Sequence, residues 1–179
     1  MTEESGSVRD LAVALDQAHA AILAVRDDQL DDPTPCSDWD VGQLVAHLAV
    51  GVGLLREMAE GGSPDWGAVP DRVDRPADRF REGADGLLAH WREAGVDGGA
   101  DWQLGELAVH TWDLVTATGQ ATDLDPAPAE RGLAFMSQAL QPDMRGDVFA
   151  PEQQPPPDAD AHERIAAFAG RDVRAQRRG

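Results

Sequence analysis

Apolar residues recur three or four positions apart through most of this chain, which is the spacing of one face of an α-helix. In the first such segment, residues 7–25, they include Val8, Leu11, Leu15, Ala18 and Ile22. Proline and glycine divide the rest of the chain into further pieces of helical length, at residues 41–60, 77–94, 104–118 and 127–140, with a shorter piece at 161–169. No segment alternates regularly between apolar and polar residues, so we expect an all-α fold.

This pattern predicts a bundle of about four long helices followed by additional short C-terminal helices. We expect residues 1–170 to form one domain. Residues 171–179 hold four arginines and end the chain, so we expect them to be a disordered, solvated tail. Ser7 is placed to cap the first helix, and Asp40 with Gln43 has the spacing of a capping box before the second.

The composition is strongly acidic, with 33 Asp and Glu against 15 basic residues, all of them Arg, and a formal net charge of −18. Such a surface repels phosphate backbones and anionic lipid, so we expect neither nucleic acid nor a membrane as a partner. The absence of Lys and Tyr excludes a Schiff-base lysine, a phosphate-loop lysine and a phenolic acid or base. A single cysteine, Cys36, excludes an internal disulfide and a cysteine-rich zinc site.

The sequence gives no signal for export or membrane insertion. Its N-terminal residues are polar and acidic, unlike a signal peptide. The most apolar run, Leu44–Leu55, is too short to cross a bilayer and contains His47. We therefore expect a cytoplasmic protein.

Glu106 and His110 are the first candidates for metal ligands, because residues four apart in a helix share one face. Their apolar neighbours indicate that part of this helix is buried. His47 is the best third ligand, since it lies in the most apolar helix, where its ring nitrogens would otherwise lack partners. Two histidines and one carboxylate leave positions open for water, a thiolate or substrate, which is the ligand count of a catalytic site. The spacing by itself fits equally a surface Glu–His pair or a core histidine with ordinary hydrogen bonds.

Three segments carry a resemblance to a known family: PTPCSDWDVGQLVAHL, GELAVHTWDLVTATGQ and HERIAAFAGRD. The first two resemble signatures of the DinB-like superfamily, in the branch of the mycothiol-dependent maleylpyruvate isomerase metal-binding domain. The third is similar to the closing helix of its short, single-domain members, so the resemblance spans about residues 7–173. It implies a four-helix bundle that holds a divalent metal, usually zinc, with His47, Glu106 and His110 as ligands.

The resemblance also implies a function. We expect a divalent-metal-dependent enzyme that activates a low-molecular-weight thiol such as mycothiol for transfer to, or isomerisation of, a small electrophile. The isomerase that names the family has a further C-terminal domain with a catalytic arginine, which we expect this chain to lack, so maleylpyruvate is not the expected substrate. The alternatives are a non-catalytic DinB-like protein that binds a metal or ligand, and a metal-dependent hydrolase that uses activated water.

Other residues near these motifs have weaker signals. Asp113, three residues after His110, is the candidate catalytic residue, which would orient a ligand or bind a polar group; an ion pair with an arginine is its alternative role. His19 either lines the pocket or forms a buried hydrogen bond, whereas we expect His162 at the surface and Cys36 in a packing role. The ligand set suits zinc, nickel, iron and manganese, and the sequence predicts no particular oligomeric state.

Overall fold

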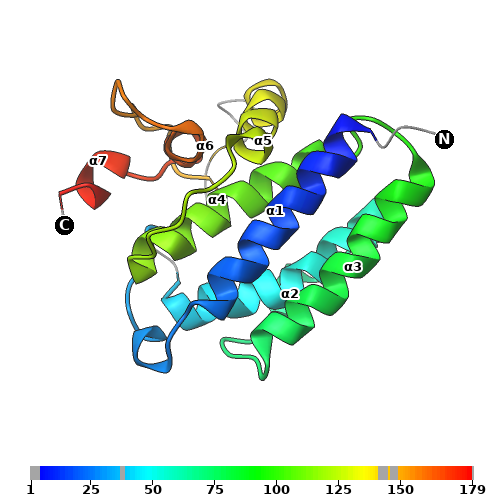
Figure 1. The fold of residues 1–179 in the computed structure, drawn as a ribbon, viewed down its shortest axis with the longest axis horizontal. Helices are drawn as coiled ribbons and strands as arrows, with labels where there is room; N and C mark the ends of the chain where they lie inside the picture. The colour runs from blue at the N-terminus through cyan, green and yellow to red at the C-terminus, as the bar shows by residue number, and fades with distance from the viewer. Residues whose placement is uncertain (1–4, 37–38, 141–144, 146–148, 179) are drawn as a thin grey trace.

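The protein is described here by a computed structural model, which covers residues 5–36, 39–140, 145 and 149–178. Seven α-helices and two 3₁₀-helices are its regular elements, and the described residues contain no β-strand (Figure 1). The α-helices are α1 (Gly6–Leu23), α2 (Val41–Ala59), α3 (Pro76–Ala94), α4 (Asp101–Thr118), α5 (Pro126–Ala139), α6 (Ala161–Phe168) and α7 (Val173–Gln176). The 3₁₀-helices are η1 (Asp27–Gln29) and η2 (Trp66–Ala68). The predicted all-α class is confirmed.

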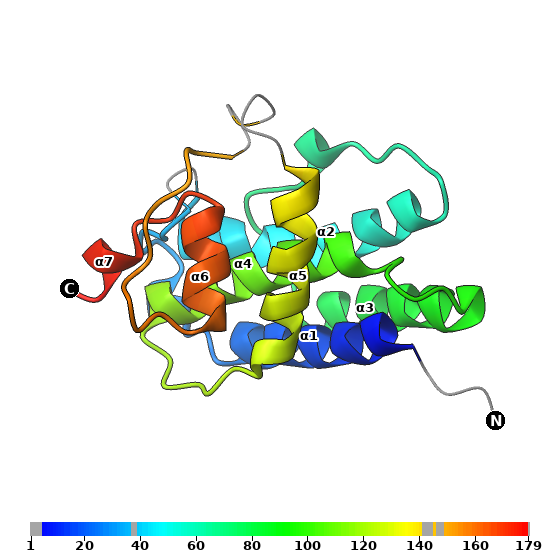
Figure 2. The same ribbon diagram turned by 90° about the horizontal axis from the view of Figure 1, so that it is seen from above.

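The first four α-helices form a bundle in which α1 and α2 each contact both α3 and α4 (Figure 1). Each helix contributes fully buried leucines to a common core, among them Leu11, Leu44, Leu87 and Leu104. Helices α5 and α6 lie across α4 rather than along it (Figure 2) and join it through a second apolar cluster that includes Ile165. This confirms the expected bundle with additional short C-terminal helices.

The start of α2 is fixed by the capping box that the sequence predicted. The carboxylate of Asp40 accepts a hydrogen bond from the backbone N–H of Gln43, whose side-chain oxygen accepts one from the N–H of Asp40. The prediction for α1 is wrong, because Ser5 and not Ser7 is the N-cap. The helix begins before Ser7, which is buried in the first turn and accepts a hydrogen bond from the N–H of Gly98.

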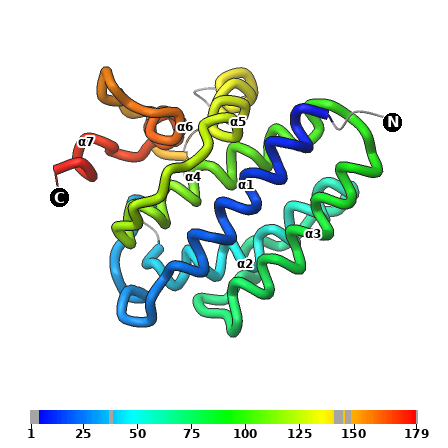
Figure 3. Tube along the Cα trace, viewed as in Figure 1, coloured from blue at the N-terminus to red at the C-terminus, as the bar shows by residue number. Residues whose placement is uncertain are grey.

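The connection from α1 to α2 passes the end of the bundle where α4 finishes, as the trace in Figure 3 shows. The side-chain amide of Gln29 in η1 donates a hydrogen bond of 2.9 Å to the carbonyl oxygen of Thr118, the last residue of α4. This contact holds the connection, which also carries Trp39, against the C-terminal half of α4.

Within residues 171–178, the structure differs from the disordered tail that the sequence predicts. Val173 in α7 is buried against Trp112 of α4 and the end of α6. The side chain of Arg171 is only 10% exposed and forms an ion pair with Asp113 of α4. The prediction was based on local composition, and a partner 58 residues away along the chain is invisible to it.

His162 is a second correction, since it is 3% exposed and not at the surface. It lies in the first turn of α6, where Asp160 and Glu163 form a capping box on the solvent side. The imidazole faces inward, and its Nε2 has no hydrogen-bond partner among the described residues. Burial lowers the pKa of His162, although Asp160 and Asp125 oppose this effect.

Helix α2 is the one described helix whose length and composition would allow it to cross a membrane. The apolar stretch of this helix is therefore longer than the run Leu44–Leu55 alone. However, 56% of its most apolar window is buried inside the protein, as expected for the central helix of a bundle.

Candidate metal centre

Two imidazoles and one carboxylate meet between α2 and α4. Nε2 of His47 lies 2.8 Å from Oε1 of Glu106, and Nε2 of His110 lies 3.4 Å from the same oxygen. Each residue offers one ligand atom that lies within 4.8 Å of the other two. Helix α4 thus presents two of the predicted residues one turn apart, and α2 brings the third to them.

The cluster is an electrostatically coupled group with little solvent around it. Burial opposes the ionisation of Glu106, but the charge and hydrogen bond of His110 and the hydrogen bond of His47 outweigh it and hold the pKa of Glu106 below its usual range. Burial also disfavours the charged form of His110, but Glu106 and Asp113 outweigh it and raise the pKa of His110 to about 9. The carboxylate of Glu106 is therefore ionised, and the positive charge beside it is that of protonated His110. A divalent cation bound at this carboxylate could supply the positive charge instead.

Asp113 lies directly behind His110 and is fully buried. Its Oδ2 is 3.1 Å from Nδ1 of His110, and its two oxygens accept hydrogen bonds from Nη2 and Nε of Arg171 at 2.8 and 3.2 Å. In the neutral imidazole, a carboxylate at Nδ1 favours the tautomer that carries its proton there, so Nε2 would be the ligand atom once a metal displaces its proton. Both contacts considered for Asp113 from the sequence, with a ligand histidine and with an arginine, are present together.

Two tryptophans enclose His47. The ring centroids of Trp39 and Trp66 lie 4.3 and 5.5 Å from that of His47, and Trp39 lies 5.4 Å from His110. Beside His47 and Glu106 is a narrow space of about 10 Å³, which is room for about one water molecule. Apart from these two polar residues its wall is apolar, built by Leu48, Gly51, Val52, Leu55, Trp66 and Leu107.

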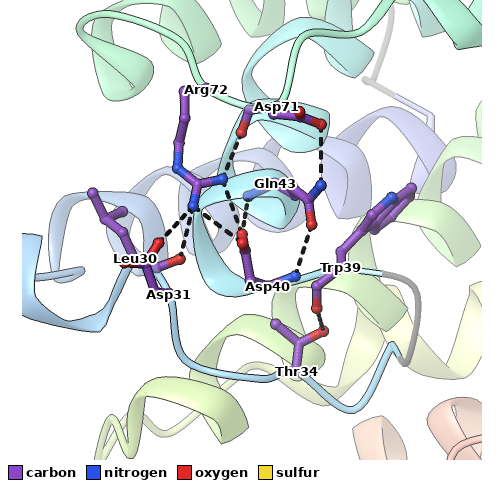
Figure 4. A network of polar contacts seen from close by, with 8 residues as sticks. All are labelled: Leu30, Asp31, Thr34, Trp39, Asp40, Gln43, Asp71 and Arg72. Carbon is purple, nitrogen blue, oxygen red and sulfur yellow. Dashed lines mark hydrogen bonds and ion pairs between the residues drawn. The ribbon is translucent and has the colours of Figure 1, made fainter.

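A polar network holds the segments that carry both tryptophans near the start of α2 (Figure 4). Arg72, in the loop between α2 and α3 that also contains η2, donates hydrogen bonds to Asp40 and Asp31 at 2.9 to 3.1 Å. The hydroxyl of Thr34 donates one of 2.7 Å to the carbonyl oxygen of Trp39. Asp40 therefore both caps α2 and anchors the loop that leads to the indole wall.

The residues present fit a divalent metal. The donor set is two imidazole nitrogens and one carboxylate oxygen, which zinc and the other first-row divalent ions accept. The contact between His110 and Asp113 directs Nε2 of His110 toward the same point as Nε2 of His47. Three protein ligands leave coordination positions open for a further ligand, and the narrow apolar space lies beside two of the three residues, His47 and Glu106.

Some candidate residues lie elsewhere, and two contributors were missed. His19 stacks on Phe80 at 6.3 Å and is not part of the pocket wall, and Cys36 is not in the ligand cluster. Trp66 and Arg171 were not among the residues predicted to serve the site. A tryptophan in a Pro- and Gly-rich loop is a signal that could have pointed to Trp66. Arg171 lies within the segment HERIAAFAGRD, unlike the other arginines of the tail, and its place there is a signal that could have pointed to it.

Comparison with known proteins identifies related sequences. The sequence model of the mycothiol maleylpyruvate isomerase N-terminal domain family matches residues 11–115, which include all three residues of the cluster. Two uncharacterised proteins of Mycobacterium tuberculosis, from strains CDC 1551 and H37Rv, are each 35% identical to this chain over 185 aligned positions. The alignments cover 88% of this chain and 93% of each relative. No solved structure matches significantly.

Proposed function

Because the chain belongs to the mycothiol maleylpyruvate isomerase N-terminal domain family, we propose that it is a cytoplasmic enzyme that uses a divalent metal, zinc, to activate a low-molecular-weight thiol. The thiol, mycothiol in this proposal, is used for transfer to, or isomerisation of, a small electrophile. The observation that carries the proposal is the convergence of His47, Glu106 and His110, with a narrow, apolar space beside His47 and Glu106.

When bound, the divalent metal would supply Lewis acidity that lowers the pKa of a thiol on its open side toward neutrality. The residues of the chain do the rest. His47 and His110 would provide neutral nitrogen ligands, and Glu106 would reduce the net charge of the centre by one. Asp113 touches His110 and not the open space, so in this proposal it is a positioning residue that acts through His110.

The reaction needs no redox partner. In an addition, the sulfur electron pair forms a carbon–sulfur bond, and the proton lost by the thiol is balanced by protonation of the adjacent carbon. In a substitution, the leaving group departs with its bonding pair and the proton passes to solvent. Trp39 and Trp66 flank His47 and limit the water that reaches the centre, which protects a reactive thiolate.

The test is a transfer assay with a chloronitrobenzene as electrophile, in the presence and absence of mycothiol. We expect turnover that requires both mycothiol and zinc and that falls at least about 100-fold in His110→Ala, since one of three metal ligands is lost. His19→Ala, outside the cluster, should retain activity. Thiol-independent hydrolysis of ester or amide probes would instead support the hydrolase alternative, and equal activity of the wild type and His110→Ala would contradict both.

The narrow space beside His47 supports a second candidate function. With room for about one water molecule, a metal centre of this kind would act as a non-catalytic binding protein unless Trp66 moves to admit a substrate. Zinc binding without turnover for any combination of thiol and electrophile would favour this candidate.

A further inference from the structure

The two sides of the candidate centre differ in polarity. The space beside His47 and Glu106, here called the open side, is apolar, whereas an ion pair lies beyond His110. On the open side, the wall beside His47 and Glu106 consists of aliphatic side chains and the indole of Trp66. The charged groups lie on the other side of His110, where Asp113 and Arg171 form a buried ion pair. A ligand that reaches the open side therefore meets apolar surface everywhere except at the ligand atoms themselves.

The charges of the complete centre cancel. A divalent cation contributes two positive charges, Glu106 one negative charge and a bound thiolate another, while Asp113 and Arg171 neutralise each other. No arginine is among the described residues that line the space. A carboxylate or phosphate carried by the electrophile would lose its hydration there without gaining a partner, which is strongly unfavourable.

We propose that the electrophile used at this site is uncharged, with an apolar group next to its reactive atom, and that carboxylate-bearing molecules are excluded. This inference rests on the proposed function, because it assumes a thiol at the metal. It separates this chain from an enzyme for maleylpyruvate, which carries carboxylates, and it follows from the wall of the space rather than from the ligand set.

Gly51 borders the space next to Trp66 and His47 and is the place where a small added group tests this proposal. It lies one turn after His47 in α2, and a Cβ atom placed on it would lie 3.2 Å from Cζ3 of Trp66 and 3.9 Å from Nε2 of His47. The missing side chain thus lets the indole of Trp66 lie close to helix α2 beside His47, and a methyl group at this position would press on the indole. Gly53, in the same helix, offers a matched control, because a Cβ atom placed on it would have no neighbouring heavy atom within 4 Å among the described residues outside its own stretch of helix.

The experiment measures binding by absorption spectroscopy of the cobalt-loaded protein, because cobalt reports thiolate coordination directly. The probes are benzyl mercaptan and para-(mercaptomethyl)benzoate, which differ by one carboxylate that is too far from the sulfur to chelate the metal. They carry into the pocket the same apolar or charged group that an electrophile would bring. We expect benzyl mercaptan to bind at least about 10-fold more tightly. Gly51→Ala should weaken its binding by about 10-fold, and Gly53→Ala should leave it unchanged.

Each outcome decides a different point. Cobalt loading with equal affinity for the two thiols, or with tighter binding of the benzoate, would overturn this inference and leave the metal centre intact. Cobalt loading without binding of either thiol would overturn it as well. Failure of the folded protein to load cobalt would overturn the proposed function and this inference together. Circular dichroism of both glycine variants establishes that they are folded.

Discussion

At the scale of single residues, His110 of the candidate metal centre is held in place by contacts at both of its ring nitrogens. Its Nδ1 faces Asp113, and its Nε2 faces Glu106. Arg171 holds Asp113 through both carboxylate oxygens, so the carboxylate has little freedom to turn away. The orientation of a candidate metal ligand therefore depends on a residue outside the part of the chain that the family model matches.

We predict that Asp113→Asn and Arg171→Gln each lower the zinc affinity by about 10- to 100-fold, because the support of a ligand histidine is weakened. Competition with a chromophoric chelator measures the affinity. Arg177→Gln is the matched control, since Arg177 pairs with Glu163 at the surface of the same C-terminal segment and should leave affinity unchanged. A loss of thermal stability in Asp113→Asn and Arg171→Gln with no change in affinity would show that the contact is structural only.

The three clustered residues were predictable from the sequence, whereas their supports were not. Glu106 and His110 share a helix, so their spacing alone placed them on one face; His47 followed from its position in the most apolar helix, and the family resemblance implied the same three residues. Arg171 belongs to an arginine-rich end whose composition indicates solvent exposure. Its role depends on how α6 docks on α4, which is a tertiary contact that no local pattern encodes.

At the scale of elements, α6 carries in its first turn a buried histidine whose charged form is disfavoured by burial. His162 is buried against the bundle with its Nε2 unpartnered among the described residues, and burial holds its pKa below the ordinary value. The unfolded chain binds a proton at His162 near pH 6.5, whereas the folded chain does so only at a lower pH. The contribution of this residue to stability is therefore fully present above about pH 6.5 and decreases as the pH falls below it.

We predict that the free energy of unfolding falls between about pH 7 and 5.5 by more in the wild type than in His162→Leu, by up to about 1.4 kcal/mol for each unit by which the pKa is lowered. Urea unfolding at each pH, with fluorescence as the signal, measures this difference. Carboxylates titrate in both proteins, so the comparison isolates His162. Identical pH profiles would show that His162 does not titrate differently in the folded and unfolded states.

Most helices were predictable because their signals are local. The capping box of Asp40 and Gln43 and the glycines after α3 and α4 mark ends that the structure reproduces, with Gly95 and Gly119 at positive φ. The inward orientation of His162 was not predictable, since a polar residue in the first turn of a short helix is usually exposed. The direction of α5 and α6 across the bundle also depends on packing and not on periodicity.

At the scale of the whole molecule, the net charge of −18 has a specific meaning for the centre. A negative field favours the approach of a divalent cation and disfavours that of an anionic ligand. With no Lys and no Tyr in the chain, and with Cys36 outside the ligand cluster, the proposed chemistry depends on a metal held by His47, Glu106 and His110. The central claim is thus that this bundle is a metal protein.

Metal analysis of protein purified without a histidine tag tests that claim most directly. We predict about one divalent ion per chain after equilibration with zinc and removal of the excess. His110→Ala should lose this ion, whereas His19→Ala should keep it, because His19 lies against Phe80 on another face of the bundle. A folded wild-type protein that holds less than about 0.1 ion per chain, with no gain when zinc is added, would contradict the account.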